Sequence, residues 1–419
     1  MANKKILLIT YYWPPSGGSG VQRWLYFANN LVEMGYDVTV MTSESANYQL
    51  YDHELENFVS SKIKVIKVSL FEPSKLIKSK DSSSDNINNV GFLNKIKLFI
   101  RANFFFPDSR KFWIKKVVKI AVNYINNNKT DYLITTSPPF SLNIIGYKIK
   151  SKTNVRWISD YRDPWSDFFQ FRKMPMFNYV FNKHLKWEEI CLKNADLVIV
   201  TAPSLKDSYL KINPNTFLIN NGFEKYNEVN NKGLFNIVYS GVMKSSQNPV
   251  KLWKVISELS KTNKSFSDDL NIKLIGDFDE SITKNKHLVF LNEKVKFIKY
   301  VSKTNLYNFH SDSSVFLLCD IDDSKGGNLI PGKFYNYLSY KIPIIAFSKK
   351  GTDIYNIVNE TSSGKVFGFS NEIELKNHIL GLYSDFKDNK MSYNKNKYDK
   401  YLISNLTQEL DKLIKKINY

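Results

Sequence analysis

Short runs of β-branched and aliphatic residues alternate with amphipathic segments along almost the whole of this 419-residue chain. Strands separated by helices cannot pair as hairpins, so the alternation predicts βα units and parallel sheets. We expect strands at 6–10, 37–41, 64–68, 132–135, 156–159, 197–201, 216–219, 236–240, 272–275, 296–299, 314–318 and 344–347. We expect helices at 21–34, 92–105, 111–127, 140–151, 175–194, 204–211, 248–261, 303–310 and 331–340.

A polar, turn-rich stretch at 222–235 separates two such series of strands and helices. It predicts a boundary between an N-terminal α/β domain at 1–225 and a second α/β domain at 226–398. The remaining segment, 399–419, carries apolar residues at helical spacing. We therefore expect a C-terminal helix that packs back across the first domain.

A glycine-rich turn at 14–23 is the first candidate site, because ligands bind beyond the carboxyl ends of strands in open α/β sheets. Gly18 and Gly20 let the backbone of this turn approach an anion at a helix start. Arg23 occupies the third glycine position of the dinucleotide fingerprint, which weakens a nicotinamide-binding interpretation. A plain tight turn remains the alternative. The stretch Ser137-Pro138-Pro139-Phe140 also follows a strand, but proline at a helix start favours a structural interpretation there.

Three charged residues, Asp160, Arg162 and Asp163, come directly after the strand at 156–159. Charges clustered at the carboxyl end of a strand are typical of a functional site. A carboxylate at this position orients or deprotonates an acceptor hydroxyl, and Arg162 binds phosphate or pairs with a carboxylate. The alternative is a structural Asp–Arg pair that caps the loop.

The second domain carries two further candidates, both suited to a diphosphate. Gly241 and Lys244 end the strand at 236–240, and a surface lysine is the alternative for Lys244. Further along the chain, glycines precede a helix that begins with proline and lysine. This arrangement favours the binding of an anion. The candidate donor-binding residues there are Gly327, Asn328, Leu329, Ile330, Pro331, Lys333 and Asn336.

The remaining polar residues exclude several classes of site. The five histidines lack the spacing of a metal site, so we expect no metal and no other cofactor. Cys191 and Cys319 lie 128 positions apart, which indicates neither a disulfide framework nor a metal knuckle and suits a reducing cytoplasm. No run of 18 apolar residues occurs, so no transmembrane helix is expected.

A net charge of +19 favours anionic partners. No nucleic-acid recognition motif accompanies it, so nucleic acid is not the expected partner. The segment 95–119 holds eight Lys or Arg against one Asp, interleaved with aromatic residues. Such a surface docks on anionic lipid, at the inner face of the cytoplasmic membrane; the alternative is buried aromatics with solvated lysines.

Nine stretches make the chain similar to family 4 glycosyltransferases, and to their bacterial polysaccharide subgroup in particular. They cover nearly the whole chain in the family's order: YYWPPSGGSGVQRW at 11–24, FFFPDSRKFW at 104–113, SDYRDPWSD at 159–167, ADLVIVTAPS at 195–204, INNGFE at 219–224, IVYSGVMKSSQNP at 237–249, KLIGDFDE at 273–280, KFIKYVSK at 296–303 and IPGKFYNYLSYKIPIIAF at 330–347.

The resemblance implies the GT-B fold, in which two Rossmann-like domains with parallel sheets face each other across a cleft. It also implies a retaining, metal-independent transfer from a nucleotide sugar, with UDP-sugars favoured. The donor is expected on the second domain and a glycan or polyprenyl-diphosphate-linked acceptor on the first. The implied process is capsule, O-antigen or exopolysaccharide synthesis by a hexosyl- or N-acetylhexosaminyltransferase.

The chain departs from the family pattern at one pair of positions. The family usually carries two glutamates eight positions apart, which touch the donor sugar and the ribose. Here those positions are Asn328 and Asn336, which still form hydrogen bonds but carry no charge. Two alternatives therefore stay open: a nucleotide-sugar-binding protein without catalysis, and a sugar-nucleotide epimerase of the same fold.

Overall fold

The computed structural model describes residues 4–44, 46–48, 50–71, 92–167, 174–231, 233–321, 329–390 and 397–417. The chain forms two compact units. The first extends to Asn221 and also includes the C-terminal segment Ile403–Tyr419, and the second spans Gly222–Leu402. Within the described residues, no helix is both long and apolar enough to cross a bilayer.

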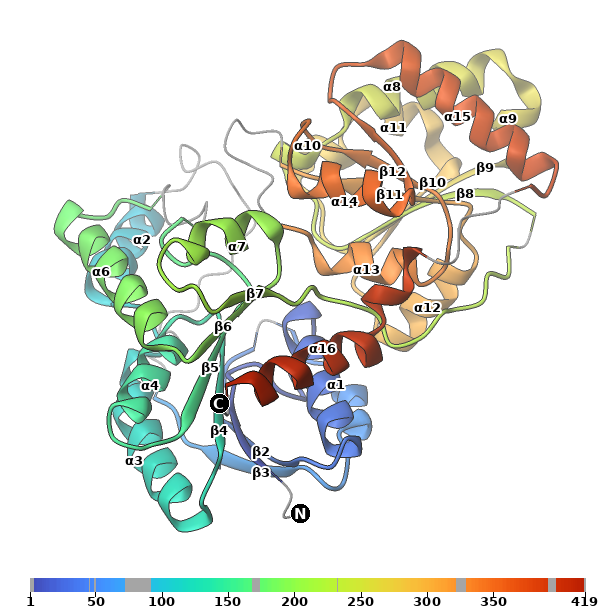
Figure 1. Ribbon diagram of the computed structural model, residues 1–419. Coiled ribbons are helices and arrows are strands. Elements are labelled where there is room, and N and C mark those ends of the chain that lie inside the picture. The colour runs from blue at the N-terminus through green and yellow to red at the C-terminus, as the bar shows by residue number, and fades with distance from the viewer. Residues whose placement is uncertain are drawn as a thin grey trace. The chain divides into compact units, whose positions relative to one another are not determined.

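The first unit is built on a parallel sheet of seven described strands in the order β3-β2-β1-β4-β5-β6-β7 (Figure 1). Its strands are β1 (Lys5–Ile9), β2 (Asp37–Ser43), β3 (Lys64–Val68), β4 (Tyr132–Ser137), β5 (Arg156–Tyr161), β6 (Leu197–Val200) and β7 (Thr216–Leu218). Its helices are α1 (Ser19–Glu33), η1 (His53–Phe58), α2 (Phe92–Phe104), α3 (Lys111–Asn128), α4 (Ser141–Lys150), α6 (Asn178–Asn194), α7 (Pro203–Leu210) and α16 (Ile403–Lys416).

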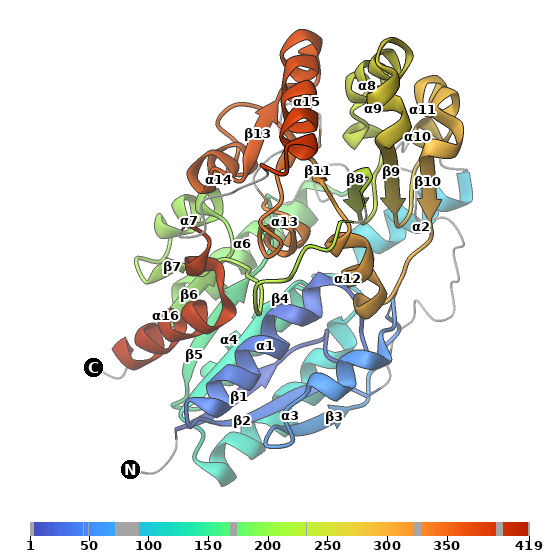
Figure 2. The ribbon, with the colours of Figure 1, turned by 90° about the vertical axis from the view of Figure 1, so that its right-hand side faces the viewer.

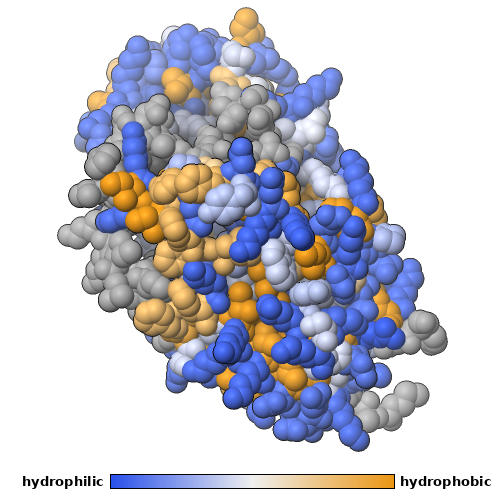
Figure 3. All heavy atoms as spheres, turned by 90° about the vertical axis from the view of Figure 1, so that its left-hand side faces the viewer, coloured by the Kyte–Doolittle hydropathy of each residue, from blue (hydrophilic) through white to orange (hydrophobic). Residues whose placement is uncertain are grey.

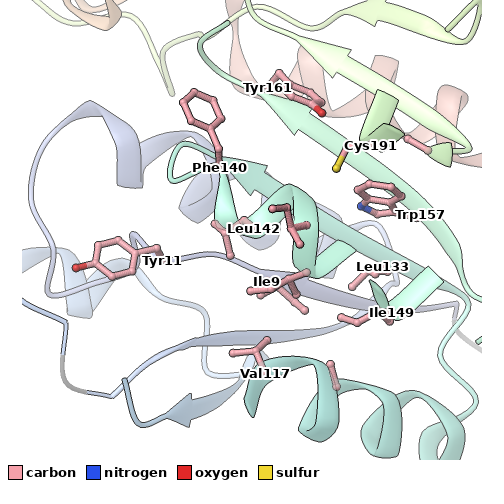
Figure 4. Close-up of a cluster of buried hydrophobic side chains, with 14 of the residues drawn as sticks. Ile9, Tyr11, Val117, Leu133, Phe140, Leu142, Ile149, Trp157, Tyr161 and Cys191 are labelled. Atoms are coloured by element: carbon pink, nitrogen blue, oxygen red, sulfur yellow. The ribbon is translucent and has the colours of Figure 1, made fainter. Parts of the chain in front are cut away.

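Alternate residues of these strands enter two cores on opposite faces of the sheet, as the pleat requires. Leu7 and Ile9 pack with α3, α4 and α6, and Figure 4 shows the centre of that core around Trp157. Ile6 and Leu8 pack on the other face with α1 and α16. Helices α1 and α16 are also joined by a polar contact, because Asn30 Nδ2 donates a hydrogen bond to Thr407 Oγ1 at 3.2 Å. The C-terminal helix therefore packs back on the first unit, as predicted.

The second unit has a parallel sheet of six described strands in the order β10-β9-β8-β11-β12-β13 (Figure 2). Its strands are β8 (Phe235–Ser240), β9 (Leu270–Ile275), β10 (Val295–Ile298), β11 (Val315–Cys319), β12 (Ile344–Phe347) and β13 (Gly364–Phe367). Its helices are η4 (Ser245–Gln247), α8 (Val250–Thr262), α9 (Lys264–Asp269), α10 (Glu280–Thr283), α11 (Lys286–Leu291), η5 (Asn292–Lys294), α12 (Lys303–Ser311), α13 (Gly332–Leu338), α14 (Asp353–Thr361), α15 (Glu372–Lys387) and η7 (Asp399–Tyr401).

The same two-sided packing recurs in this second unit. Ile237 and Tyr239 of β8 join one core with α8 and α15, while Val238 joins the other with α13 and α14. In each sheet the strand order reverses direction beside the first strand of the unit, next to β1 and next to β8. At the carboxyl edge of an open α/β sheet, such a reversal is the place where a crevice forms and ligands bind.

Several described elements were not predicted, namely the helices α9, α10, α11, α14 and α15 and the edge strand β13, and one predicted strand ended too early. The edge strand β13 was not expected, because its four residues, GKVF, begin with glycine and carry a lysine, so they give a weak strand signal. Strand β5 runs to Tyr161, so Asp160 lies within the strand and not in the loop after it. Within the strand, Asp160 follows the alternation of the pleat, so its side chain lies on the same face as Ile158 and contacts α1.

Candidate functional site

The carboxyl edge of the first sheet is held together by Arg162. Its guanidinium donates from Nη1 to the carbonyl of Gly20 at 2.7 Å, from Nη2 to the carbonyl of Pro138, and from Nε to the carbonyl of Ser137 at 3.3 Å. These carbonyls belong to the segments that follow β1 and β4, on the two sides of the crevice. Arg162 therefore fixes the crevice walls, and burial lowers its pKa.

Glycine at position 20 lets the guanidinium of Arg162 approach the turn closely. A Cβ there would lie 2.7 Å from Nη1 of Arg162, closer than side chains tolerate. Gly18 caps the start of α1 with a φ of 87°, which L residues rarely adopt. Both glycines thus shape the turn, and the position of Gly20 is set by an arginine more than 140 residues away.

Asp160 is fully buried and all its bonding capacity is used within the unit. Arg23 forms an ion pair with it at 3.0 Å, Trp24 Nε1 donates at 2.6 Å, and Thr136 Oγ1 donates at 2.7 Å. Arg23 in turn donates to the carbonyl of Asn220 at 2.8 Å. This geometry suits a carboxylate that orients Arg23 and the 220–221 turn, and it leaves no oxygen for a substrate.

Asp163 differs from Asp160 in every respect. Asp163 is half-buried, and none of the described residues donates a hydrogen bond to its carboxylate. Burial raises its pKa, the charge of Arg162 opposes that shift, and the charge of Asp160 adds to it. An acidic group with spare acceptor capacity and a raised pKa beside the crevice is suited to bind a hydroxyl.

The sequence analysis missed the residue that anchors the loop of Asp163. Glu188, buried on α6, accepts hydrogen bonds from the backbone of Trp165 at 3.2 Å and of Ser166 at 3.1 Å. It also accepts from the hydroxyls of Ser166 and Tyr209. Burial raises the pKa of Glu188, and these donors oppose the rise. A glutamate on a helical face with aromatic neighbours gave no sequence signal for this role.

In the second unit, Lys333 lies at the crevice between β8 and β11. It belongs to the first turn of α13, and its ammonium sits 3.8 Å from the centroid of the Tyr239 ring. The described residues place no carboxylate in an ion pair with it. Burial lowers its pKa to about 7, partly offset by Cys319. A half-buried cation with no acidic partner among the described residues is suited to bind an anion.

Glycines keep the backbone open around this ammonium. A Cβ on Gly241 would lie 3.2 Å from the Lys333 ammonium, and Gly241 has a φ of 119°. A Cβ on Gly276, at the end of β9, would lie 2.2 Å from the carbonyl of Gly241. Sequence reasoning named Gly241 but not Gly276, whose signal was its position directly after a strand.

The other predicted donor residues are placed as follows. Lys244 is half-buried at the start of η4, where its backbone N–H donates to Gln247 Oε1 at 3.2 Å. Ile330 is buried, and Leu329 and Pro331 are half-buried ahead of α13. Asn336 lies one turn after Lys333 on α13 and is half-buried. Gly327 and Asn328 lie outside the described residues. No three His, Cys, Asp or Glu side chains in the described ranges form a cluster able to hold a metal ion.

Comparison with known proteins places this geometry in a family context. Residues 221–398 match the family model described as "Glycosyl transferases group 1". No curated protein matches the sequence of the chain.

Solved structures match nearly the full length. A sucrose-phosphate synthase from Thermosynechococcus elongatus has a TM-score of 0.67 at 15% identity, covering 99% of each chain. WaaG, a glycosyltransferase involved in lipopolysaccharide biosynthesis, has a TM-score of 0.58 at 10% identity, covering 97% of this chain and 99% of its own. A putative UDP-N-acetylglucosamine 2-epimerase from Listeria monocytogenes has a TM-score of 0.59 at 11% identity, covering 99% and 96%. At these identities the matches show the fold.

Proposed function

Since residues 221–398 match the model of the group 1 glycosyl transferases and the chain has the GT-B fold, we propose a specific reaction for it. The protein transfers a sugar from a nucleotide-diphosphate sugar, with a UDP-sugar favoured, to a glycan acceptor with retention of configuration. No metal takes part in this proposal. The acceptor is lipid-linked, and the product is a cell-surface polysaccharide made at the inner face of the cytoplasmic membrane.

One observation carries the donor assignment: the ammonium of Lys333 over the Tyr239 ring, without an acidic partner among the described residues. The bond from the sugar's anomeric carbon to the diphosphate breaks, and negative charge builds on the β-phosphate. A preorganised cation near that phosphate stabilises the charge. A bound diphosphate supplies the counterion that Lys333 lacks and raises its pKa back toward the ordinary value.

The acceptor assignment depends on Asp163 in the first unit. Its carboxylate accepts a hydrogen bond from the acceptor hydroxyl and orients that oxygen for the transfer. As the new bond forms, the hydroxyl proton passes to the leaving phosphate. Asp160 holds Arg23, and Arg162 holds the crevice, so neither is assigned direct contact with substrate.

The first experiment is a thermal shift with UDP, GDP, ADP, CMP and their common sugar conjugates, without metal. A ligand at 100 times its dissociation constant adds about 2.7 kcal/mol of apparent stability. We expect one nucleotide family to shift the wild-type protein and Lys333→Met to lose that shift. Lys341→Met is the matched control, since the Lys341 ammonium also lies over a ring, 3.6 Å from the centroid of Tyr226.

A second candidate function follows from Asn336, which carries an amide where the family usually has a carboxylate. A protein that binds the nucleotide sugar without transferring it would show the thermal shift and release no nucleotide with any acceptor. Detection of nucleotide release and of a lengthened glycan by mass spectrometry decides between the two functions.

A further inference from the structure

The first unit carries an exposed aromatic face on elements that are distant in sequence. It consists of Phe71 after β3, Ile100 and Phe104 on α2, Phe112 on α3, and Phe177 and Tyr179 at the start of α6, each 42–67% exposed. Hydrophobic side chains gather among hydrophilic ones on the surface shown in Figure 3. Isolated exposed apolar residues need no explanation, but a contiguous group indicates an interaction surface.

Specific contacts fix this face in place. The rings of Phe71 and Phe112 lie 6.0 Å apart, and those of Phe177 and Tyr179 lie 5.7 Å apart. Buried Asn103 ties α2 to the segment before α6, donating to the carbonyl of Pro175 at 2.8 Å and accepting from Phe177 N at 2.7 Å. The face is therefore a built surface made from three helices. Trp113, also within 95–119, is not part of the face because it lies in the core.

The charges that α2 and α3 contribute around the face have one sign. Helices α2 and α3 contain no acidic residue, and they carry Lys95, Lys97, Arg101 and Lys115 as exposed cations. Lys111 adds an ammonium 4.9 Å from the ring centroid of Phe112. Aromatic rings that partition into an interface, surrounded by cations, are complementary to anionic lipid headgroups.

The chain segment that joins two residues of the face also contacts the carboxyl edge of the sheet in the same unit. The segment between Phe104 and Phe112 contains Asp108, whose Oδ2 accepts from Ser141 N at 2.8 Å, and Arg110, whose Nη2 donates to the hydroxyl of Tyr11 at 3.1 Å. Tyr11 and Ser141 lie in the segments that follow β1 and β4. Residues that hold the crevice are thus covalently linked to residues of the exposed face.

We infer that this aromatic face binds the surface of an anionic bilayer and presents the crevice of the first unit to molecules embedded there. The inference deepens the proposed function, because it states where the lipid-linked acceptor is met. It predicts binding without insertion of a helix across the membrane.

The test is flotation of the full chain with vesicles of phosphatidylcholine alone or with 30% phosphatidylglycerol. We expect binding to the anionic vesicles only, and release in 1 M salt because surface charges are then screened. Phe104→Ser with Phe112→Ser should weaken binding about ten-fold or more, from lost apolar contact. Lys95→Gln with Lys97→Gln should weaken it about 25-fold, at about five-fold per charge.

The matched controls lie on the second unit. Phe290→Ser removes a ring that is 52% exposed and lies 4.3 Å from the Lys261 ammonium. Lys296→Gln with Lys299→Gln removes two exposed cations. Both should leave vesicle binding unchanged. Equal binding to neutral vesicles, no binding to anionic ones, or equal loss in face and control variants would each overturn the inference.

The nucleotide thermal shift of every variant separates this inference from the proposed function. Face variants that fold should keep the wild-type shift, since Lys333 lies in the other unit. A wild-type protein that binds anionic vesicles but no nucleotide would contradict the proposed function and leave the lipid surface established. A protein that binds nucleotide but no vesicle would contradict this inference and leave the proposed function intact.

Discussion

The ammonium of Lys333 lies 3.8 Å from the centroid of the Tyr239 ring, and no described carboxylate pairs with it. The face of an aromatic ring attracts a cation by about 2 kcal/mol when the pair is desolvated. This attraction offsets part of the free energy that the cation loses when it leaves water. Burial nevertheless lowers the Lys333 pKa to about 7. The contact therefore holds the ammonium in place while leaving its charge available for a ligand.

Lys333→Met should weaken nucleotide binding and stabilise the unliganded protein. Loss of a charge-assisted hydrogen bond costs about 1.5–3 kcal/mol, or roughly ten-fold or more in affinity. The pKa of Lys333 is about 7 in the folded chain, below its value in the unfolded chain. At a pH between these two pKa values the folded chain binds fewer protons than the unfolded chain, so the folded state loses stability as the pH falls toward 7. Melting temperatures should show the variant above wild type at pH 6 and equal to it near pH 11. A lower melting temperature at pH 6 would contradict the assignment.

Nucleotide binding should be linked to proton uptake at Lys333. An anion favours the charged form, so binding should take up a proton when the free protein is above about pH 7. Titration calorimetry at pH 8 in buffers of different ionisation enthalpy measures that uptake. We expect wild type and Lys341→Met to show it and Lys333→Met to lose it.

Asp163→Asn should lower transfer about 100-fold while leaving donor affinity unchanged. Its raised pKa means that the folded chain holds the proton more tightly, so the ionised carboxylate reduces stability above the unfolded pKa. The variant should therefore melt at or above the wild-type temperature at pH 7 and lose this advantage in acid. Asp167→Asn, in the same loop, is the control. Full activity of Asp163→Asn would remove the residue from the mechanism.

Glu188→Ala should raise the acceptor KM and lower kcat, because Trp165 and Ser166 lose the partner that orders the Asp163 loop. Donors left unpaired in the interior also cost about 1–3 kcal/mol of stability each. Glu188→Gln keeps one acceptor oxygen and should restore most of the activity. Glu189→Gln, at an exposed neighbouring position, is the control. If transfer and stability fall in parallel in both Glu188 variants, the role is structural alone.

Gly20→Ala should destabilise the first unit, since the added Cβ would lie 2.7 Å from Arg162 Nη1. We expect a cost of about 1–3 kcal/mol, as for other overpacked positions. Gly381→Ala, on α15 with no atom within 4 Å of the added Cβ, should instead stabilise by up to about 1 kcal/mol. Thermal unfolding of both variants tests this contrast, and an undisturbed Gly20→Ala would show that Arg162 does not fix the turn.

The fold class followed from local patterns in the sequence. Alternating apolar runs predicted nearly every described strand, since a strand buried on both faces must be almost wholly apolar. The amphipathic spacing at 401–417 predicted that α16 packs on other residues of the chain. Strand β13 escaped prediction because an edge strand needs fewer apolar residues.

The roles within Asp160-Tyr161-Arg162-Asp163 were not decided by the sequence. The sequence placed a charged cluster at the end of a strand but presented its members as equivalent candidates. Only the tertiary structure distinguishes them, because Arg23 and Trp24 occupy Asp160 whereas Asp163 has unused acceptor capacity. Glu188 and the exposed aromatic face likewise emerge only when distant segments come together. Periodicity determines secondary structure locally. Burial and hydrogen-bond partners assign a charged side chain its role, and they depend on other elements of the fold, 23 positions away for Glu188 and Trp165 and 137 positions away for Asp160 and Arg23.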